Sequence, residues 1–353
     1  ELVGIVVAAS TITGIFLKFP AGTLSDLFGR RHLLRIGVVV FAACPFFYLF
    51  PHTSWTLVLL RVVHGGATAI FGPVVSAVVS DLAPTYRRGT WLGSYAAAQG
   101  GGQAAGQMLG GALLSLGAFQ YPFLASAVLG TLAFLLLPRV GASPASVGGT
   151  SALKRLRQSL RAILSDRLIL LISLGTAGQY LGNGALSGFL PLYASQVAGL
   201  VPWQIGIVFG VQTGSLLAFR PLLGTLSDRL GRAPLMIGGM LTSVLGLLAL
   251  PALRTLPSLL LFAVIYGAAF AATSATSMAW ITDRATRASY GAAHGAYGTI
   301  FDMGDASGPI IAGFLIGALG YSAGFRLLAV PMLLIAALLA LSIGLVRSGR
   351  RPQ

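Results

Sequence analysis

Apolar runs long enough to cross a lipid bilayer follow one another along almost the whole of this chain of 353 residues. Examples are Leu33 to Phe50, Phe123 to Leu137 and Leu327 to Val346, and a membrane-spanning helix needs roughly 20 predominantly apolar residues. Only 9% of the residues are charged, against about 25% in soluble domains. The sequence therefore predicts an all-α membrane protein with many spans and little room for a soluble domain.

The net charge of +15 is distributed in a way that favours membrane topology over nucleic-acid binding. If the apolar runs are helices, the loops alternate between strongly basic and almost uncharged, and the uncharged side holds little beyond Arg254 and Arg326. Cytoplasmic loops of membrane proteins carry an excess of Lys and Arg. We therefore expect the basic loops in the cytoplasm and no nucleic-acid partner.

Eleven spans divide into groups of five and six around the longest polar interval. We expect an N-terminal bundle over residues 1–138, a cytoplasmic linker over 139–166, a six-helix bundle over 167–346 and a cytoplasmic tail over 347–353. Within the linker, ALKRLRQSLRAIL predicts a basic amphipathic helix on the lipid surface, with a merely solvated charged helix as the alternative. The expected spans are 1–18, 33–50, 55–80, 89–117, 120–138, 168–196, 203–220, 234–252, 257–281, 291–318 and 324–346.

The two groups of spans repeat one sequence unit at a constant offset of 202 residues, from Gly22 to Gly224. GTLSDLFGRR opens at the first of these glycines and GTLSDRLGRA at the second. The same register holds through four helices, so the chain is predicted to be two copies of one helical unit. Further pairs at this offset are Gly65 and Gly267, Asp81 and Asp283, Tyr95 and Tyr297, Gly102 and Gly304, and Gly106 and Gly308.

The first copy lacks a counterpart of the span expected at 168–196, because that counterpart would precede Glu1. Residue 1 is glutamate rather than methionine. We therefore expect that a helix is missing from the numbered chain and that the parent protein has six plus six spans. Restoring that helix would bring both termini to the cytoplasm.

Gly22 to Arg31 resembles the cytoplasmic signature between the second and third helices of major facilitator superfamily transporters, and Gly224 to Arg232 resembles its second-half echo. The resemblance implies the major facilitator fold, with two pseudo-symmetric helical bundles and eleven of an expected twelve helices. It also implies a cytoplasmic gate that breaks when the halves rock; fixing topology alone is the alternative role. The gate candidates are Gly22, Asp26, Gly29, Arg30, Asp81, Asp228 and Arg232.

Two further motifs resemble those of proton-coupled members of the superfamily. Arg61-Val-Val-His64-Gly65 is similar to the fourth-helix motif RxxxG, where an intramembrane arginine faces a cavity or a partner unless it snorkels to the interface. Closely spaced glycines resemble a fifth-helix motif of antiporters, but Gln107 stands where proline is expected. This helix-crossing motif comprises Gly102, Gly106, Gly110 and Gly111, with Gly304, Gly308 and Pro309 in the second copy.

Two aspartates lie near the middle of the span expected at 291–318. Asp305 stands at the offset position of Gln103, and Asp302 lies one helical turn before it. Carboxylates inside a membrane are functional by default, as proton sites or as counter-charges for cationic substrates. We predict that Arg61, Asp302 and Asp305 take part in proton coupling; a bond that only fastens helices together is the alternative.

Polar side chains within the spans predict a central substrate cavity. Three glutamines recur every four residues and form one stripe, which must face protein or water in a lipid environment. Mixed amides, hydroxyls and aromatic rings suit a broad pocket for amphiphilic molecules, although such groups also bond neighbouring helices. The cavity candidates are Gln99, Gln103, Gln107, Gln179, Tyr180, Asn183, Gln212 and Trp280.

Together these patterns predict a monomer in the bacterial cytoplasmic membrane that exports a small organic molecule or drug by proton-coupled alternating access. Proton-linked import of a metabolite is one alternative, which Gln107 in place of proline keeps open. An inactive transporter-like scaffold is another, for the case that Glu1 is the native terminus.

A membrane-embedded enzyme is disfavoured by the distribution of reactive residues. The four histidines are scattered without the spacing of a convergent acid, base or metal site, and no phosphate-binding P-loop motif is present. Cys44 is the single cysteine, so no disulfide can form within the chain. We expect neither a metal nor a cofactor.

Overall fold

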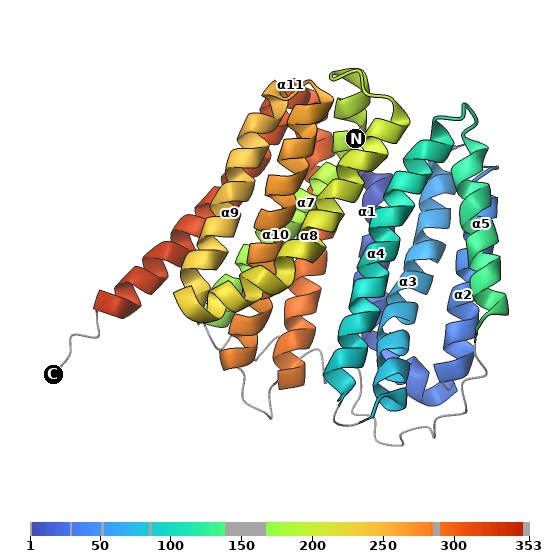
Figure 1. The fold of residues 1–353 in the computed structure, drawn as a ribbon, viewed down its shortest axis with the longest axis horizontal. Helices are drawn as coiled ribbons and strands as arrows, with labels where there is room; N and C mark the ends of the chain where they lie inside the picture. Colours follow the sequence, from blue (N-terminus) through green and yellow to red (C-terminus); the bar gives the residue numbers. More distant parts are fainter. Residues whose placement is uncertain are drawn as a thin grey trace.

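Long helices account for almost all of the chain that the structure describes (Figure 1). The computed structural model describes residues 2–28, 30–50, 53–84, 87–137, 167–284 and 290–348. The helices are α1 Leu2–Phe28, α2 Arg30–Phe47, α3 Ser54–Leu82, α4 Arg88–Leu114, α5 Gln120–Leu135, α7 Arg167–Gln196, α8 Pro202–Leu230, α9 Arg232–Ala249, the 3-10 helix η2 Leu250–Ala252, α10 Leu256–Arg284 and α11 Tyr290–Ser348.

Five helical stretches among the described residues are long and apolar enough to cross a membrane, judged by length and composition. α4 and α7 are outside this set, and both carry glutamines and many glycines along a length sufficient to span. Polar stripes of such helices must face protein or water in a bilayer. The five are Ser54–Leu82, Pro202–Leu230, Arg232–Ala252, Leu256–Arg284 and Tyr297–Ser342, and shorter apolar helices cover Leu2–Leu17, His32–Phe47 and Gln120–Leu135.

The last two expected spans, 291–318 and 324–346, are present as two helices within α11, and a kink at Gly320 takes the place of a longer loop between them. Within α11 only Gly320 departs from helical geometry, with φ 78° and ψ 171°. Glycine adopts positive φ about as readily as negative φ. The chain therefore bends at one residue between two helical segments, which count as separate spans.

The helices that contain the expected spans 1–18 and 203–220 extend about ten residues beyond them. Hydropathy ends the expected spans near the first basic residue, whereas α1 continues to Phe28 and α8 to Leu230. The repeated charged signature is therefore mostly helical rather than a loop, because nothing in it before its second glycine breaks a helix. Gly231, with φ 94°, makes the turn from α8 into α9.

The helices form two bundles that lie side by side (Figure 1). The N-terminal bundle contains α1 to α5, with its main contacts in the pairs α1–α3, α2–α3 and α2–α5. The C-terminal bundle contains α7 to α11, chiefly through α7–α11, α8–α10, α9–α10 and α9–α11. The pairs α4–α8, α1–α11 and α1–α7 join the two bundles. The expected linker, 139–166, lies outside the described residues.

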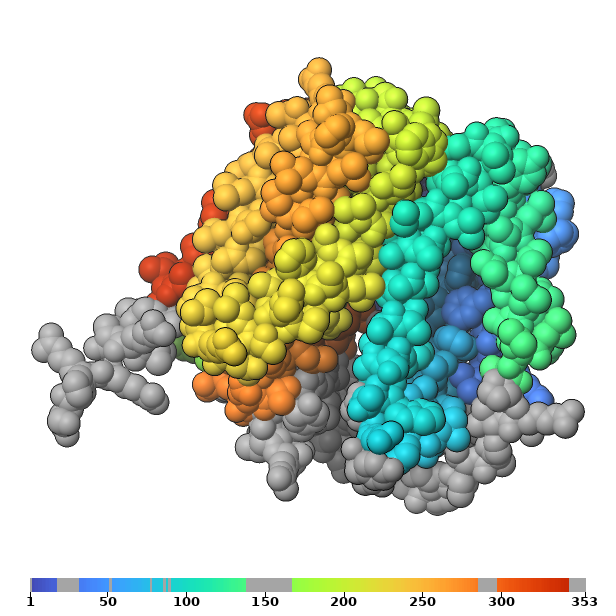
Figure 2. Space-filling view, in the orientation of Figure 1, coloured from blue at the N-terminus to red at the C-terminus, as the bar shows by residue number. Residues whose placement is uncertain are grey.

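The two bundles differ in how many of their side chains are buried. The C-terminal core centres on the nearly fully buried Leu186, Tyr266 and Phe325. The N-terminal cluster between α2 and α3 holds only four buried residues among those described, such as Leu34 and Val74. No residue of α5 is buried, nor is any described side chain of α4. Figure 2 shows the surface hollowed between α4 and α5, where the first helices are visible below.

Candidate functional site

A polar cavity of about 250 Å³ lies where α4 of the N-terminal bundle meets α7, α8 and α10 of the other bundle. Amides, hydroxyls and aromatic rings line it, and none of the described residues around it is charged. They are Gln103, Gln107, Tyr180, Asn183, Ser187, Phe209, Gln212, Thr213, Leu216, Gly267 and Phe270.

Hydrogen bonds within the polar cavity leave one buried acceptor unused. Thr213 Oγ1 donates to Gln107 Oε1 at 2.8 Å, which links the two bundles. Gln212 Nε2 donates to Asn183 Oδ1 at 3.5 Å. Gln212 is 8% exposed, and its Oε1 has no partner among the described residues. An unsatisfied buried acceptor costs about 1–3 kcal/mol, so this atom is suited to accept a bond from a bound molecule.

Aromatic rings form one wall of the polar cavity. Tyr180 stacks on Phe301 with ring centroids 4.5 Å apart, and Phe270 meets it edge-on at 5.0 Å. At Gly267 an added Cβ would collide with the backbone carbonyl of Gln212. The absence of a side chain there lets α8 and α10 approach closely enough to set the position of the amide.

A second, acidic cavity of about 210 Å³ lies between the bundles where α11 meets α1 and α3. It combines two carboxylates with hydroxyl groups, and Asp302 is 6% exposed. A Cβ on Gly65 would collide with the carbonyl of Ser10, so glycine permits the α1–α3 crossing that forms one wall. The lining residues are Ser10, Thr11, Gly14, Gly65, Thr68, Ala69, Asp302 and Asp305.

The bundles touch backbone to backbone at the end of α8 that is far from Gly231. A Cβ on Gly111 of α4 would lie 2.8 Å from Gly206 Cα of α8. Small residues allow such close crossings. An apolar recess of about 480 Å³ adjoins this contact and shares Gln107 and Phe209 with the polar cavity.

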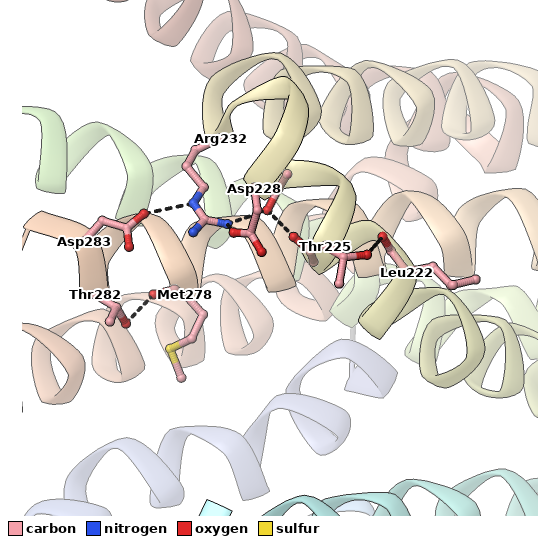
Figure 3. Close-up of polar contacts among 9 residues, drawn as sticks. Leu222, Thr225, Asp228, Arg232, Met278, Thr282 and Asp283 are labelled. Carbon is pink, nitrogen blue, oxygen red and sulfur yellow. Dashed lines mark hydrogen bonds and ion pairs between the residues drawn. The ribbon is translucent and has the colours of Figure 1, made fainter.

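At the other end of α8, Arg232 ties α8, α9 and α10 together (Figure 3). Its Nη1 lies 2.6 Å from Asp228 Oδ1 and also donates to Ser227 Oγ, while its Nε donates to Asp283 Oδ2 at 2.9 Å. The two carboxylate side chains are 59% and 51% exposed. Solvent screening therefore keeps the energy of each ion pair modest.

The model of the Major Facilitator Superfamily matches residues 1–215 and 172–353, so both bundles are covered. The chain belongs to the major facilitator superfamily. It is accordingly an integral, multi-pass membrane protein of a transporter family.

Individual members of the superfamily are similar at low identity. The quinolone resistance protein NorA of Staphylococcus aureus is 25% identical over 204 residues, which are 58% of this chain and about half, 52%, of NorA. The MFS-type transporter MJ1560 of Methanocaldococcus jannaschii is 23% identical over 338 residues, 93% of this chain and 85% of that protein. A crystal structure of the nucleoside transporter NupG superposes with a TM-score of 0.75 at 15% identity, covering 96% of this chain and 90% of NupG.

The superfamily signature is visible in detail in the second copy. Asp228 and Arg232, two of the gate candidates, form an ion pair there, and Asp283 forms a second one with Arg232. Asp283 was not among the gate candidates, although its offset from Asp81 is the signal that identifies it. Asp81 is exposed on α3. The side chains predicted at positions 22, 26, 29 and 30 lie outside the described residues.

Five of the predicted cavity residues come together in the polar cavity. Gln99 instead lies exposed on α4. Gln179 is fully buried within the C-terminal bundle and donates to Ser243 Oγ at 2.9 Å. Trp280 packs against a hydrophobic cluster of the same bundle. The five that meet are Gln103, Gln107, Tyr180, Asn183 and Gln212.

The proton-coupling candidates also do not all lie together. Asp302 and Asp305 share the acidic cavity, whereas Arg61 is not among the described residues that line either cavity. His64, near it on α3, faces α2, with the hydroxyl of Tyr48 3.4 Å from its Nδ1 and the ring of Phe41 at 5.6 Å.

The helix-crossing glycines lie in different surroundings in the two copies. A Cβ on Gly304 or Gly308 would collide with the backbone of α7. Added Cβ atoms on Gly102, Gly106 and Gly110 would meet no described atom within 4 Å. Pro309 packs against α1, where its carbonyl leaves no room for a Cβ on Gly4.

Sequence reasoning missed several lining residues. Phe209 and Phe270 border the polar cavity, and Thr11 and Thr68 border the acidic one. Phe209 lies three residues before Gln212, a spacing that places both on one helix face. The hydroxyls carry no comparable signal, because threonines are frequent throughout these helices.

Proposed function

We propose that this chain is a proton-coupled exporter of small organic molecules, working as a monomer by alternating access in the bacterial cytoplasmic membrane. The observation that carries the proposal is the acidic cavity, where carboxylates of α11 face α1 and α3 of the other bundle. A buried carboxylate is costly to keep charged. Taking up or releasing a proton at Asp302 or Asp305 therefore changes how firmly the two bundles hold together.

The substrate site in this proposal is the polar cavity, which is separate from the acidic cavity. Both lie at contacts between the bundles. Rocking of the bundles about these contacts would separate α4 from α8 near Gly111 and close the gap between the bundles at the end that carries Arg232. The opposite movement would then return the transporter to its first state. The name of the relative NorA, a quinolone resistance protein, supports export.

The test is transport in proteoliposomes with an imposed pH gradient. The probes are radiolabelled uracil, nicotinamide, uridine and norfloxacin. We expect the gradient to drive at least one probe against the proton flux, and Asp305→Asn to lower this driven transport at least tenfold. Gln99→Asn, at an exposed position of α4 outside both cavities, is the control and should retain coupling. Transport that is indifferent to the gradient contradicts proton coupling.

Import is the second candidate, favoured by one contact. Gln107 occupies the position of the antiporter-motif proline, so α4 has no proline there to bend it. Gln107 instead accepts a hydrogen bond from Thr213 across the bundles. In the same assay, a probe that moves together with protons identifies an importer, and one that moves against them an exporter.

A further inference from the structure

The chemistry of the polar cavity limits the charge of what it can bind. Its described lining contains four side-chain amides, three hydroxyl groups and two phenylalanines, with no acid and no base. An ion placed in such a site leaves water without gaining a counter-charge from the lining, which is unfavourable. An uncharged polar molecule loses far less, because amides offer both donors and acceptors.

The unused acceptor adds a requirement on the ligand. Gln107 Oε1 already accepts from Thr213, and Gln212 Nε2 already donates to Asn183. Gln212 is one of the residues that line the cavity, and its Oε1 is buried with no partner among the described residues. A ligand with an N–H or O–H group would satisfy this oxygen, whereas a pure acceptor would leave it unpaired.

The volume of the polar cavity and its aromatic wall restrict the size and shape of the ligand. The volume of about 250 Å³ lies just below the usual range of ligand pockets, roughly 300–1,000 Å³. Tyr180 and Phe270 belong to the lining and meet edge to face there. Flat rings pack well on such surfaces.

We propose that the polar cavity binds small, uncharged molecules with a flat ring and an N–H or O–H donor directed to Gln212 Oε1, and that it rejects ionised forms of the same rings. This substrate class rests on the proposed transport function. It excludes permanently charged compounds. The range of substrates is therefore narrower than that of the broad pocket for amphiphilic molecules expected from the sequence.

The test is binding of matched probes to the purified full chain in detergent, by isothermal titration calorimetry. The neutral probes are uracil, nicotinamide and uridine. Their charged counterparts are orotate, nicotinate and uridine 5′-monophosphate as anions and 1-methylnicotinamide as a cation. We expect at least one neutral probe to bind, with each of its charged counterparts at least tenfold weaker.

Gln212→Leu should weaken the bound neutral probe at least tenfold, because the variant removes the acceptor while keeping the side-chain size. Gln196→Leu is the matched control, because Gln196 lies away from the cavity and accepts a hydrogen bond from the hydroxyl of Tyr321. The affinity of this variant for the neutral probe should be unchanged. Circular dichroism and gel filtration verify that both variants are folded.

The substrate class is overturned if no neutral probe binds, if a charged counterpart binds within threefold of its neutral form, or if Gln212→Leu keeps full affinity. Binding in detergent needs no gradient. If a neutral probe binds selectively but the gradient drives no transport, only the proposed coupling is contradicted. If the gradient drives transport of norfloxacin or a charged probe while no neutral probe binds, only the substrate class is contradicted.

Discussion

The two bundles come from one repeated sequence unit, yet their equivalent glycines have different neighbours. In the C-terminal bundle α7 packs along α11, and Gly304 and Gly308 touch its backbone. At the same offset in α4, Gly102 and Gly106 face open space among the described residues. The glycine motif therefore marks a helix-packing face, and burial in each bundle depends on whether a helix occupies that face.

One methyl group added at equivalent positions should have opposite effects on stability in the two bundles. Gly308→Ala would drive a Cβ into the Leu181 carbonyl, so we expect the free energy of unfolding to fall by about 1–3 kcal/mol or more. Gly106→Ala should instead gain about 0.5–1 kcal/mol, because alanine loses less backbone entropy in a helix. Thermal unfolding of the purified variants, followed by tryptophan fluorescence, measures both. Equal losses of stability would contradict the difference in packing between the two positions.

A smaller effect should distinguish bonds within a bundle from bonds between bundles. Ser243→Ala leaves the fully buried Gln179 Nε2 without its acceptor, and we expect about 1–3 kcal/mol of destabilisation. Thr213→Val breaks the bond to Gln107 beside a cavity that water can enter, which should cost under about 1 kcal/mol. Urea unfolding of the two variants makes the comparison. A larger loss at Thr213 would mean that the bundles are held together as firmly as each is held internally.

The smallest effect concerns the Arg232 cluster and its first-copy counterpart. A double-mutant cycle with Arg232→Met and Asp283→Asn should give a coupling energy below about 1 kcal/mol that falls with added salt, because the carboxylates are half exposed. The cycle at Arg30 and Asp81 should give the same within error, since the two pairs occupy equivalent positions in the repeat. A coupling in one copy only would show that the two signatures have diverged in role.

Helix positions were predictable because each span must be apolar over a length fixed by the bilayer. Helix ends were less so. Hydropathy falls at Lys18 and Arg220, but the helical backbone does not need apolar side chains and continues for another turn or more. The bend at Gly320 could not be foreseen either, because the sequence does not show that a single positive-φ residue replaces a loop.

The candidate site was predictable only in part, because polarity does not reveal which neighbour a side chain meets. Gln103 and Gln212 reach the cavity, whereas Gln179 is satisfied by Ser243 inside its own bundle. In sequence the three are equivalent amides in apolar helices. The rotation of each helix about its axis decides between them, and close glycine crossings such as Gly267 against Gln212 set that rotation.

The most direct test of the account is to lock the bundles together across the polar cavity. In a Cys44→Ser background, Gln107→Cys with Thr213→Cys places one cysteine on each bundle, and Gln179→Cys with Ser243→Cys places both within the C-terminal bundle. Transport in proteoliposomes is measured before oxidation, after it, and after reduction. We predict that oxidation abolishes transport only in the first pair and that reduction restores it. Undiminished transport with the first disulfide fully formed would contradict the claim that the bundles separate there during the cycle.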